Sequence, residues 1–289
     1  MYPINNFTIL KFWQKQVILF IISISFYPAF SSNEIFKGVH HDDYSVSFSG
    51  YVSIGGIDQY IEVNGKDEEK LLLLILQSDP GTSDISMYNT YNKHLKDSFI
   101  VAFWDQRGTG KSYNKNIPDT SMTYDQLFKD TYEVVKWLCK KFDKKKLLLF
   151  GASWGGTLGM RVVSKYPELF YGFIASSPIL NAAETMKLSN QLTLQKAKSA
   201  HHRVATRRLE RLNPPFDLST KKGFNKFKTQ KKLVMYFGGY IANQEAIELY
   251  SDARFYNKYN SLLALITLIR GVTYSYRLYG PGFQRLSLN

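Results

Sequence analysis

Apolar residues along this chain fall into short runs that are separated by polar, glycine-containing loops. Four such runs predict buried strands, at 71–76, 99–104, 147–150 and 170–175. Ahead of them, the segments 51–54 and 57–63 flank Gly55-Gly56, and two such residues between strand-like segments are a strong signal for a β-hairpin. We therefore expect a sheet that begins with an antiparallel pair and continues with buried, mainly parallel strands.

A different spacing, with apolar residues three or four positions apart, lies between residues 121 and 142. It predicts an amphipathic helix. One face carries Leu127, Val134, Val135, Leu138 and Phe142, and the opposite, solvent-facing side is expected to carry Lys129, Asp130, Lys136 and Lys140. Strands that alternate with helices predict the α/β fold class.

From residue 180 onward the chain changes to long segments of helical spacing. The strongest are 192–212 and 245–259, and 262–269 is a shorter apolar helix segment. Asn213-Pro214-Pro215 and Gly238-Gly239 interrupt these segments, because proline and glycine are unfavourable inside helices. We expect a mainly helical subdomain at 180–289, after an α/β core at 32–179.

The formal net charge of +13 is concentrated in the C-terminal part of the chain. Residues 177–289 hold 18 basic and 6 acidic side chains, whereas residues 34–176 hold 17 basic and 18 acidic ones. Such a basic block can contact a nucleic acid or an anionic membrane, or an acidic partner segment that this chain lacks. The basic residues are scattered among Leu, Asn and Tyr without an aromatic-basic motif, so we expect a solvated basic surface and no nucleic-acid partner.

The first 31 residues have the features of a secretory signal peptide. Lys11 and Lys15 precede the apolar run 17–26, and Pro28 and small residues follow that run. We therefore expect cleavage after residue 31 and export, to the periplasm or as a secreted protein. The alternative is an uncleaved segment that anchors the protein to a membrane, and we expect no other membrane contact.

Cysteine and histidine usage argues against disulfides, metals and cofactors. The single cysteine, Cys139, cannot form an internal disulfide, and on its predicted helix we expect it to be a small buried apolar residue. His40 and His41 are adjacent, and the other three histidines lack the spacing of metal ligands. We expect neither a metal ion nor an organic cofactor.

The segment Gly151-Ala152-Ser153-Trp154-Gly155 is the strongest candidate for chemistry. It follows the predicted strand 147–150 and precedes helical spacing at 157–166, which Pro167 ends. A serine between glycines at a strand-to-helix turn is the nucleophile elbow of α/β hydrolases. Ser153 is therefore the expected nucleophile.

Acyl transfer by a serine also needs N–H donors for the oxyanion that develops on the substrate. The backbone N–H of Trp154 is one expected donor, because it begins the helix after the nucleophile. The second should come from Ser78 or Asp79, after the strand 71–76, because Pro80 has no N–H. A carboxylate at position 79 would oppose an oxyanion unless it points away or is paired, and a simple turn-forming role for Asp79 is the alternative.

Together with the elbow, Asp105-Gln106-Arg107-Gly108, followed by Gly110 and Ser112, resembles the proline iminopeptidase family of α/β-hydrolase serine peptidases. The resemblance implies an α/β-hydrolase fold with a helical cap at 180–289. It also implies removal of N-terminal residues, often proline, from peptides through an acyl-enzyme at Ser153. The chain differs from the family at 77–81, where His-Gly-Gly-Pro-Gly is usual and Gln-Ser-Asp-Pro-Gly stands here.

The resemblance also suggests roles for charged residues of the loop after the strand 99–104 and of the expected cap. We expect Asp105 and Arg107 to fix their loop through hydrogen bonds and an ion pair, without taking part in the chemistry. Glu184, Glu245 and Glu248 are candidates for binding a substrate α-amino group, as cap glutamates do in the resembled aminopeptidases. The alternative is that all three glutamates are solvated residues on helix surfaces.

α/β hydrolases place an acid and then a histidine after the serine. After Ser153 this chain holds only His201 and His202, which fall in the expected cap. We therefore expect a C-terminally shortened member of the family, acting on peptides or on small amides and esters. The alternatives are an esterase or amidase of the same fold and a truncated, non-catalytic protein. An epoxide hydrolase or dehalogenase is disfavoured, because those enzymes carry a carboxylate at the elbow.

Overall fold

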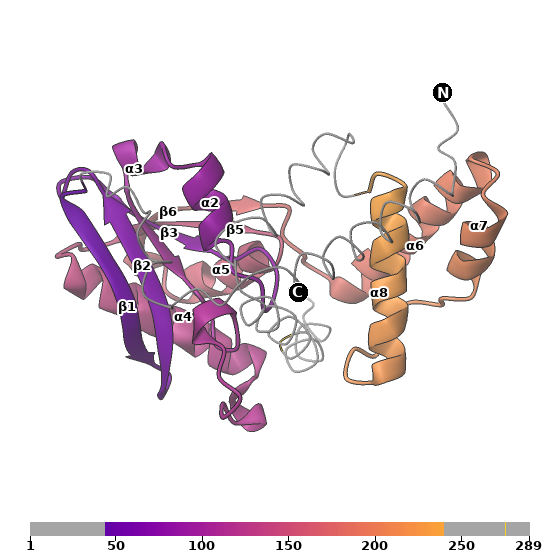
Figure 1. Cartoon of the computed structure of the whole chain (residues 1–289), viewed down its shortest axis with the longest axis horizontal. Helices are drawn as coiled ribbons and strands as arrows, with labels where there is room; N and C mark the ends of the chain where they lie inside the picture. The colour runs from indigo at the N-terminus through magenta and orange to yellow at the C-terminus, as the bar shows by residue number, and fades with distance from the viewer. Residues whose placement is uncertain (1–43, 240–274, 276–289) are drawn as a thin grey trace, which may run out of the picture. The chain divides into compact units, whose positions relative to one another are not determined.

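A computed structural model of the chain describes residues 44–239 and Ser275 (Figure 1). All of these residues belong to one compact unit, Asp43–Asn289. The expected signal peptide at 1–31 and the expected helices at 245–259 and 262–269 lie outside the described residues. Within the described part of the chain, no helix combines the length and the apolar content needed to cross a bilayer.

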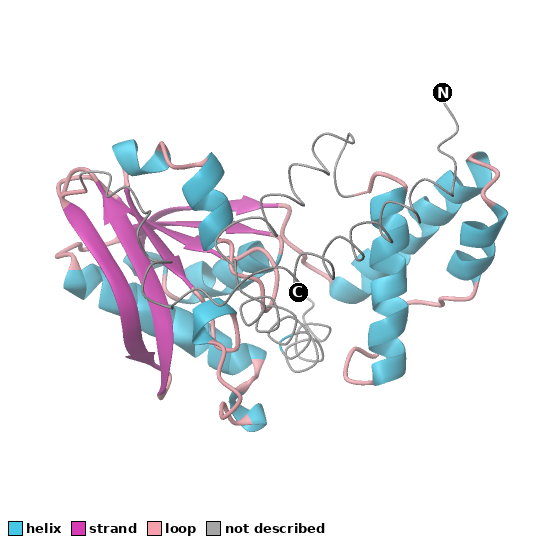
Figure 2. Cartoon of the chain, viewed as in Figure 1, coloured by secondary structure: helices cyan, strands magenta, loops and turns pink. Residues whose placement is uncertain are grey.

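The described residues form a six-stranded sheet with the order β1-β2-β4-β3-β5-β6. Figure 2 shows its strands in magenta, between helices in cyan. β1 pairs with β2 and β2 with β4 in antiparallel fashion, whereas β4, β3, β5 and β6 are parallel neighbours. The strands are β1 (Val46–Ile54), β2 (Ile57–Gly65), β3 (Leu72–Leu76), β4 (Ile100–Trp104), β5 (Leu147–Ala152) and β6 (Phe170–Ser176). The predicted hairpin, the predicted strands and the α/β class are confirmed.

Helices cover both faces of this sheet, as Figure 1 shows. α4 and α5 pack on one face, where Leu72, Leu74 and Leu76 point, and α2 and α3 pack on the other, where Leu73 and Ile75 point. This alternation follows from the two-residue period of a strand. The helices of this part are α2 (Ile85–Tyr91), α3 (Leu95–Ser98), α4 (Tyr124–Lys141) and α5 (Trp154–Lys165), with short 3-10 turns η1 (Gly110–Ser112), η2 (Asp119–Ser121) and η3 (Pro167–Leu169).

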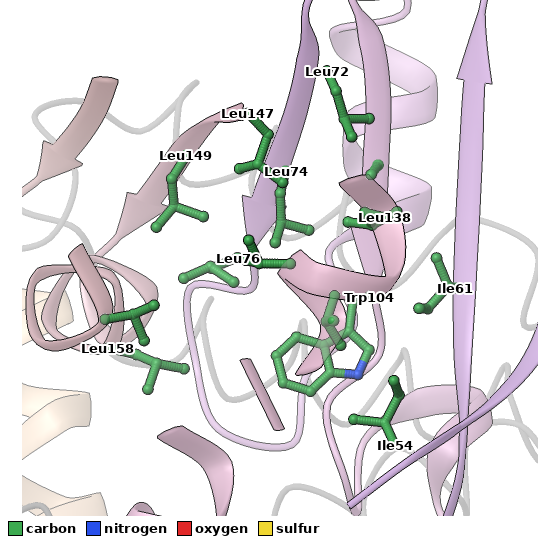
Figure 3. Packing of buried hydrophobic residues seen from close by; sticks show 14 of the residues in the cluster. Ile54, Ile61, Leu72, Leu74, Leu76, Trp104, Leu138, Leu147, Leu149 and Leu158 are labelled. Atoms are coloured by element: carbon green, nitrogen blue, oxygen red, sulfur yellow. The ribbon is translucent and has the colours of Figure 1, made fainter. Parts of the chain in front are cut away.

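The main core lies between the sheet and the α4–α5 layer. Figure 3 shows Leu74, Leu147 and Leu149 of the central strands packed near Leu138 of α4 and Leu158 of α5. Cys139 is also buried in this cluster, as expected for a small apolar residue. The core therefore anchors the strand and the helix on either side of Ser153.

One residue of α4 contradicts the predicted helix faces. Asp130 was expected in solvent, but it is fully buried and pairs with Arg107. The reason is geometric: position 130 lies three residues after Leu127 and four before Val134, so it shares their buried face. A charged residue is tolerated there because Arg107 is buried beside it.

After β6 the chain forms α6 (Ala182–Ser199), α7 (Arg203–Glu210) and α8 (Lys221–Tyr236). These helices have a hydrophobic cluster of their own, which includes Met186, Leu209 and Phe216. The continuous helical spacing expected at 192–212 is divided, because His201 has a left-handed backbone with φ +52°. His202 then begins α7, where its Nδ1 accepts the Ala205 N–H at 3.2 Å. The predicted bounds of core and cap stay a prediction.

Candidate active site

Ser153 lies at a sharp turn between β5 and α5, in the position expected of it. Its backbone has φ +49° and ψ −112°, a region that non-glycine residues rarely adopt and that costs about 1–3 kcal/mol. Its N–H donates to the Ser176 carbonyl of β6 at 2.8 Å, and its carbonyl accepts the Thr157 N–H at 3.0 Å. Its side chain makes no capping hydrogen bond to α5. The turn is therefore held by backbone contacts, and the hydroxyl is not used to cap the helix.

Two glycines of the motif are required by close packing around this turn. A Cβ added to Gly151 would collide with the Gly155 carbonyl. A Cβ added to Gly155 would lie 2.7 Å from the Gln77 carbonyl oxygen and 2.9 Å from the Leu76 Cβ. The turn can therefore close only when position 151 lacks a side chain, and the start of α5 can approach the end of β3 only when position 155 lacks one.

A cavity of about 410 Å³ lies beside Ser153, within the range of small-ligand pockets. The core supplies Ser153 and Trp154 and the loop after β3, and the helical segment supplies most of the apolar wall. The lining residues are Asp79, Pro80, Ser153, Trp154, Ser177, Ile179, Ala182, Thr185, Met186, Ser189, Leu218, Phe227, Gln230, Lys231, Val234 and Gly239. Part of the predicted cap therefore contributes to the same cavity as the predicted nucleophile.

The expected oxyanion donors lie beside Ser153, and two of them have protein acceptors. The Trp154 N–H donates to the Ser78 carbonyl over 3.3 Å, a long hydrogen bond. The Ser78 N–H donates to the Asp84 carboxylate at 2.7 Å, a short charge-assisted bond. A ligand oxygen can displace the first bond more easily than the second, so the geometry favours Trp154 over Ser78 as a donor.

Asp79, the third expected donor residue, lies at the wall of the cavity. Its carboxylate is 3.8 Å from the Lys231 ammonium of α8. Its carbonyl accepts the Thr82 N–H at 3.4 Å in a turn. Both the pairing and the turn that were considered for this residue are therefore present.

Two glutamine side chains connect the loops around the elbow. Gln77 Nε2 donates to the Asp79 carbonyl at 3.0 Å and to Thr109 Oγ1 at 3.2 Å, while its Oε1 accepts the Gln106 N–H at 3.3 Å. Gln106 Oε1 in turn accepts the Trp154 indole N–H at 3.1 Å. Because all these groups are buried or nearly so, the network fixes the loop after β3 relative to the start of α5.

Arg107 has the supporting role that was expected, with a partner that was not foreseen. Its Nε donates to Asp130 Oδ2 at 2.6 Å and its Nη2 to Asp130 Oδ1 at 3.0 Å. Further N–H groups reach Ser121 Oγ at 2.9 Å and the Gly55 carbonyl at 3.0 Å. The guanidinium therefore joins the β1–β2 turn, the η2 region and α4.

Asp105 also acts within its own loop. Its Oδ2 accepts the Lys111 N–H at 2.8 Å, and its carbonyl accepts the Ser112 hydroxyl at 2.6 Å. Burial raises the pKa of the Asp105 carboxyl to about 6, against smaller opposing effects from the Ser83 side chain and the Lys111 N–H. Asp105 does not line the cavity, which agrees with a supporting role.

The candidate base and the candidate cap carboxylates do not meet Ser153 among the described residues. His202 caps α7 and lies edge-on to Tyr236 and Phe237, with ring centroids 5.6 and 5.9 Å apart, and neither His201 nor His202 lines the cavity. Glu184 is exposed on the first turn of α6 and lies 3.8 Å from Lys187. Glu245 and Glu248 lie outside the described residues.

Gln230 and Lys231 of α8 line the cavity, and sequence reasoning missed both. Their only signal is a helical spacing that places Gln230 beside the apolar residues Phe227 and Val234. The sequence does not distinguish Lys231 from the many other lysines of this segment. Among the residues that the structure describes, no group of three or more His, Cys, Asp or Glu side chains is arranged to bind a metal ion.

Comparisons with known proteins find similarity to aminopeptidases and to other α/β hydrolases. Residues 83–273 match the family model described as serine aminopeptidase, S33. A probable aminopeptidase, YbaC, from Bacillus subtilis (strain 168) is 42% identical over 137 residues, and a proline iminopeptidase from Thermoplasma volcanium is 30% identical over 143 residues. These alignments cover 47% and 50% of this chain, but only 43% and 46% of the relatives. The chain therefore spans about half the length of the curated relatives that it matches.

Solved structures with similar coordinates include a proline iminopeptidase-related protein from Thermus thermophilus, with a TM-score of 0.43 and 17% identity, over 83% of this chain and 95% of that one. A 2-hydroxy-6-oxo-6-phenylhexa-2,4-dienoate hydrolase from a Rhodococcus species has a TM-score of 0.49 and 15% identity, over 84% and 75% of the two chains. The family match extends over residues 83–273, which include the Ser153 turn. The chain thus belongs to the S33 serine aminopeptidase family and has an α/β-hydrolase fold.

Proposed function

We propose that this protein is an aminopeptidase-type serine hydrolase that releases the N-terminal residue of a peptide, proline among others, through an acyl-enzyme at Ser153. The observation that carries the proposal is the Ser153 turn, where a strained serine lines a cavity of ligand size and does not cap its helix. The family match supports the same class of reaction.

The chemistry would follow the usual course of acyl transfer. Ser153 Oγ attacks the carbonyl carbon of the N-terminal residue and loses its proton to a base. The carbonyl oxygen becomes an oxyanion and receives the Trp154 N–H in place of the Ser78 carbonyl. The protonated base gives its proton to the leaving nitrogen as the C–N bond breaks, so the remaining peptide leaves as an amine. A water molecule, which loses a proton to the same base, then attacks the acyl group and releases it from Ser153, which takes that proton back.

The described residues place no histidine base at the cavity. His94, His201 and His202 are the histidines within the described residues, and none lines the cavity. Loss of the base and of its orienting acid costs on the order of a million-fold in turnover. We therefore propose that the chain by itself hydrolyses substrates slowly, and that a segment carrying an Asp and a His would restore full activity.

A direct test measures hydrolysis of prolyl-naphthylamide and of p-nitrophenyl acetate by the full chain, and labelling of Ser153 by a fluorophosphonate. Ser153→Ala should abolish whatever hydrolysis and labelling the chain shows, whereas Ser177→Ala, which changes another serine of the same cavity, should retain both. Ser153-dependent turnover of the naphthylamide indicates an aminopeptidase, whereas turnover of the ester alone indicates an esterase. Activity that survives Ser153→Ala would refute Ser153 as the nucleophile.

A non-catalytic, peptide-binding protein is the second candidate. It is favoured by the two expected oxyanion donors that already have protein acceptors, Trp154 and Ser78. Appending the C-terminal segment of a full-length relative distinguishes the two candidates. Restored labelling of Ser153 supports a hydrolase whose base lies outside this chain, and continued inactivity of a folded fusion supports the binding protein.

A further inference from the structure

The cavity beside Ser153 has one charged side chain of each sign. Among its lining residues in the described part of the chain, Asp79 is the only acid and Lys231 the only base. The two groups are 3.8 Å apart, and their side chains are 23% and 32% exposed. At this separation they attract each other without a close hydrogen bond, and both side chains remain partly exposed at the cavity wall.

The side-chain amide of Gln230, in the lining of the same cavity, has a hydrogen-bond acceptor without a partner among the described residues. Gln230 is 3% exposed, and its Nε2 donates to the Met186 carbonyl at 2.6 Å and to Ser189 Oγ at 2.8 Å. These two acceptors fix the orientation of the amide. Its Oε1 is buried and has no hydrogen-bond partner among the described residues. A buried acceptor without a donor is unfavourable, so a ligand N–H at this position would be bound favourably.

The lining of the cavity combines an apolar wall with a few polar groups. Trp154, Met186, Phe227 and Val234 supply apolar surface for a side chain, and the two charges and the amide supply contacts for a polar backbone. A ligand with a single positive charge would pair with Asp79 and leave Lys231 without its counter-charge. A ligand with a single negative charge would do the reverse. A dipolar ligand satisfies both charges, so it fits this lining best.

We propose that the cavity binds short peptides with both ends free, with the terminal carboxylate held by Lys231 and the terminal ammonium beside Asp79. Gln230 Oε1 accepts an N–H of the same ligand. The contacts suit a dipeptide, because Asp79 and Lys231 lie 3.8 Å apart and the two ends of a longer extended peptide would be too far apart to contact both. The inference that such peptides are cleaved rests on the proposed function, but their selective binding does not.

The test measures binding by calorimetry to the full chain carrying Ser153→Ala, so that no ligand is consumed. The ligands are prolyl-leucine, prolyl-leucine amide and N-acetyl-prolyl-leucine. We expect prolyl-leucine to bind about tenfold or more tightly than its amide, because only the free acid offers a carboxylate to Lys231. We expect the acetylated peptide to bind more weakly than prolyl-leucine by a similar factor, because it lacks the ammonium.

Matched variants assign the carboxylate contact to one lysine. Lys231→Met should remove the preference for the acid over the amide. Lys232→Met makes the same change of charge at an exposed neighbour on α8 and should retain the preference. Lys231→Arg keeps the positive charge and should also retain it. Gln230→Leu should weaken the binding of prolyl-leucine and of its amide by the same factor, because Gln230 is not expected to contact the carboxylate.

Equal affinity for acid and amide in the Ser153→Ala chain would overturn the inference before any variant of Lys231 is made. A preference that persists in folded Lys231→Met protein would overturn it as well. The proposed function fails separately: selective binding of prolyl-leucine by the Ser153→Ala chain, together with no hydrolysis by a folded fusion that carries the Asp and His segment, would support the inference and refute an aminopeptidase. Hydrolysis of arylamides, together with equal affinity for prolyl-leucine and its amide, would support the aminopeptidase and refute the inference.

Discussion

Replacing Asp130 by alanine should destabilise this protein more than any ordinary surface change, because it leaves a buried arginine without its counter-charge. The side chains of Asp130 and Arg107 are both 0% exposed, and two N–H groups of Arg107 contact the two carboxylate oxygens at 2.6 and 3.0 Å. Removal of one partner of a buried pair typically costs about 3–5 kcal/mol.

The neighbours of Asp130 place the expected loss in the upper part of this range. The carboxylate also accepts the side-chain amides of Gln59 at 3.0 Å and Gln126 at 2.8 Å. Each such bond contributes roughly 0.5–1.5 kcal/mol, although contributions within one network do not add. We expect a loss of about 4–5 kcal/mol and a fall in melting temperature of roughly 8–20 °C.

Urea and thermal unfolding, followed by circular dichroism, measure this loss. Asp125→Ala is the matched control: Asp125 lies on the same helix and contacts Arg161 at 2.7 Å, but its side chain is 76% exposed. Exposed pairs contribute about 0–1 kcal/mol, so this variant should remain close to the unmodified protein. The double variant Arg107→Met/Asp130→Ala should be more stable than Asp130→Ala alone. A loss below about 1 kcal/mol for Asp130→Ala would refute the buried pair as described.

Three further changes test local features of the structure. Burial raises the pKa of Asp105 from 3.8 to about 6, so the folded protein binds a proton there more tightly than the unfolded chain does. The free energy of unfolding of the unmodified chain therefore loses this contribution as the pH rises from about 4 to 7, whereas Asp105→Asn has no such loss. In urea titrations the variant should gain up to about 3 kcal/mol of stability relative to the unmodified chain over this pH range. Gly155→Ala should lower stability by about 1–3 kcal/mol because its Cβ meets the Gln77 carbonyl, whereas Gly172→Ala, with an ordinary 3.5 Å contact to Leu148, should change little; equal melting temperatures would contradict this. Ser153→Gly should unfold at a higher temperature than Ser153→Ala, because glycine accepts φ +49° without the strain of about 1 kcal/mol or more.

The strands and the Ser153 turn could be predicted because their signals are local. Each apolar run is bounded by polar and glycine-containing residues, and burial on both faces of a parallel strand requires such a run. The Gly-x-Ser-x-Gly pattern carries its own packing requirement, which the contacts of Gly151 and Gly155 explain. The family resemblance rested on this pattern and on the segment 105–112.

The partners of charged residues could not be predicted in this way. Asp130 was placed in solvent because charged residues are usually exposed, and the exception depends on Arg107, which is 23 positions away in the sequence. Lys231 was indistinguishable from its neighbours Lys228 and Lys232, because only tertiary packing places it near Asp79. The break at His201 was also missed, since a left-handed residue other than glycine has no clear sequence signal.

The departure at 77–81 has a structural consequence for the site. At the position where the resembled family usually carries a histidine, Gln77 uses both ends of its amide to hold the Asp79 carbonyl, Thr109 and the Gln106 N–H. The same loop directs the Ser78 carbonyl toward the Trp154 N–H. An oxyanion that takes the Trp154 N–H must displace its long 3.3 Å bond to that carbonyl, whose position Gln77 restrains through the neighbouring Asp79. Labelling of Ser153 by a fluorophosphonate, which needs the same N–H donor, therefore reports on the loop as well as on the base.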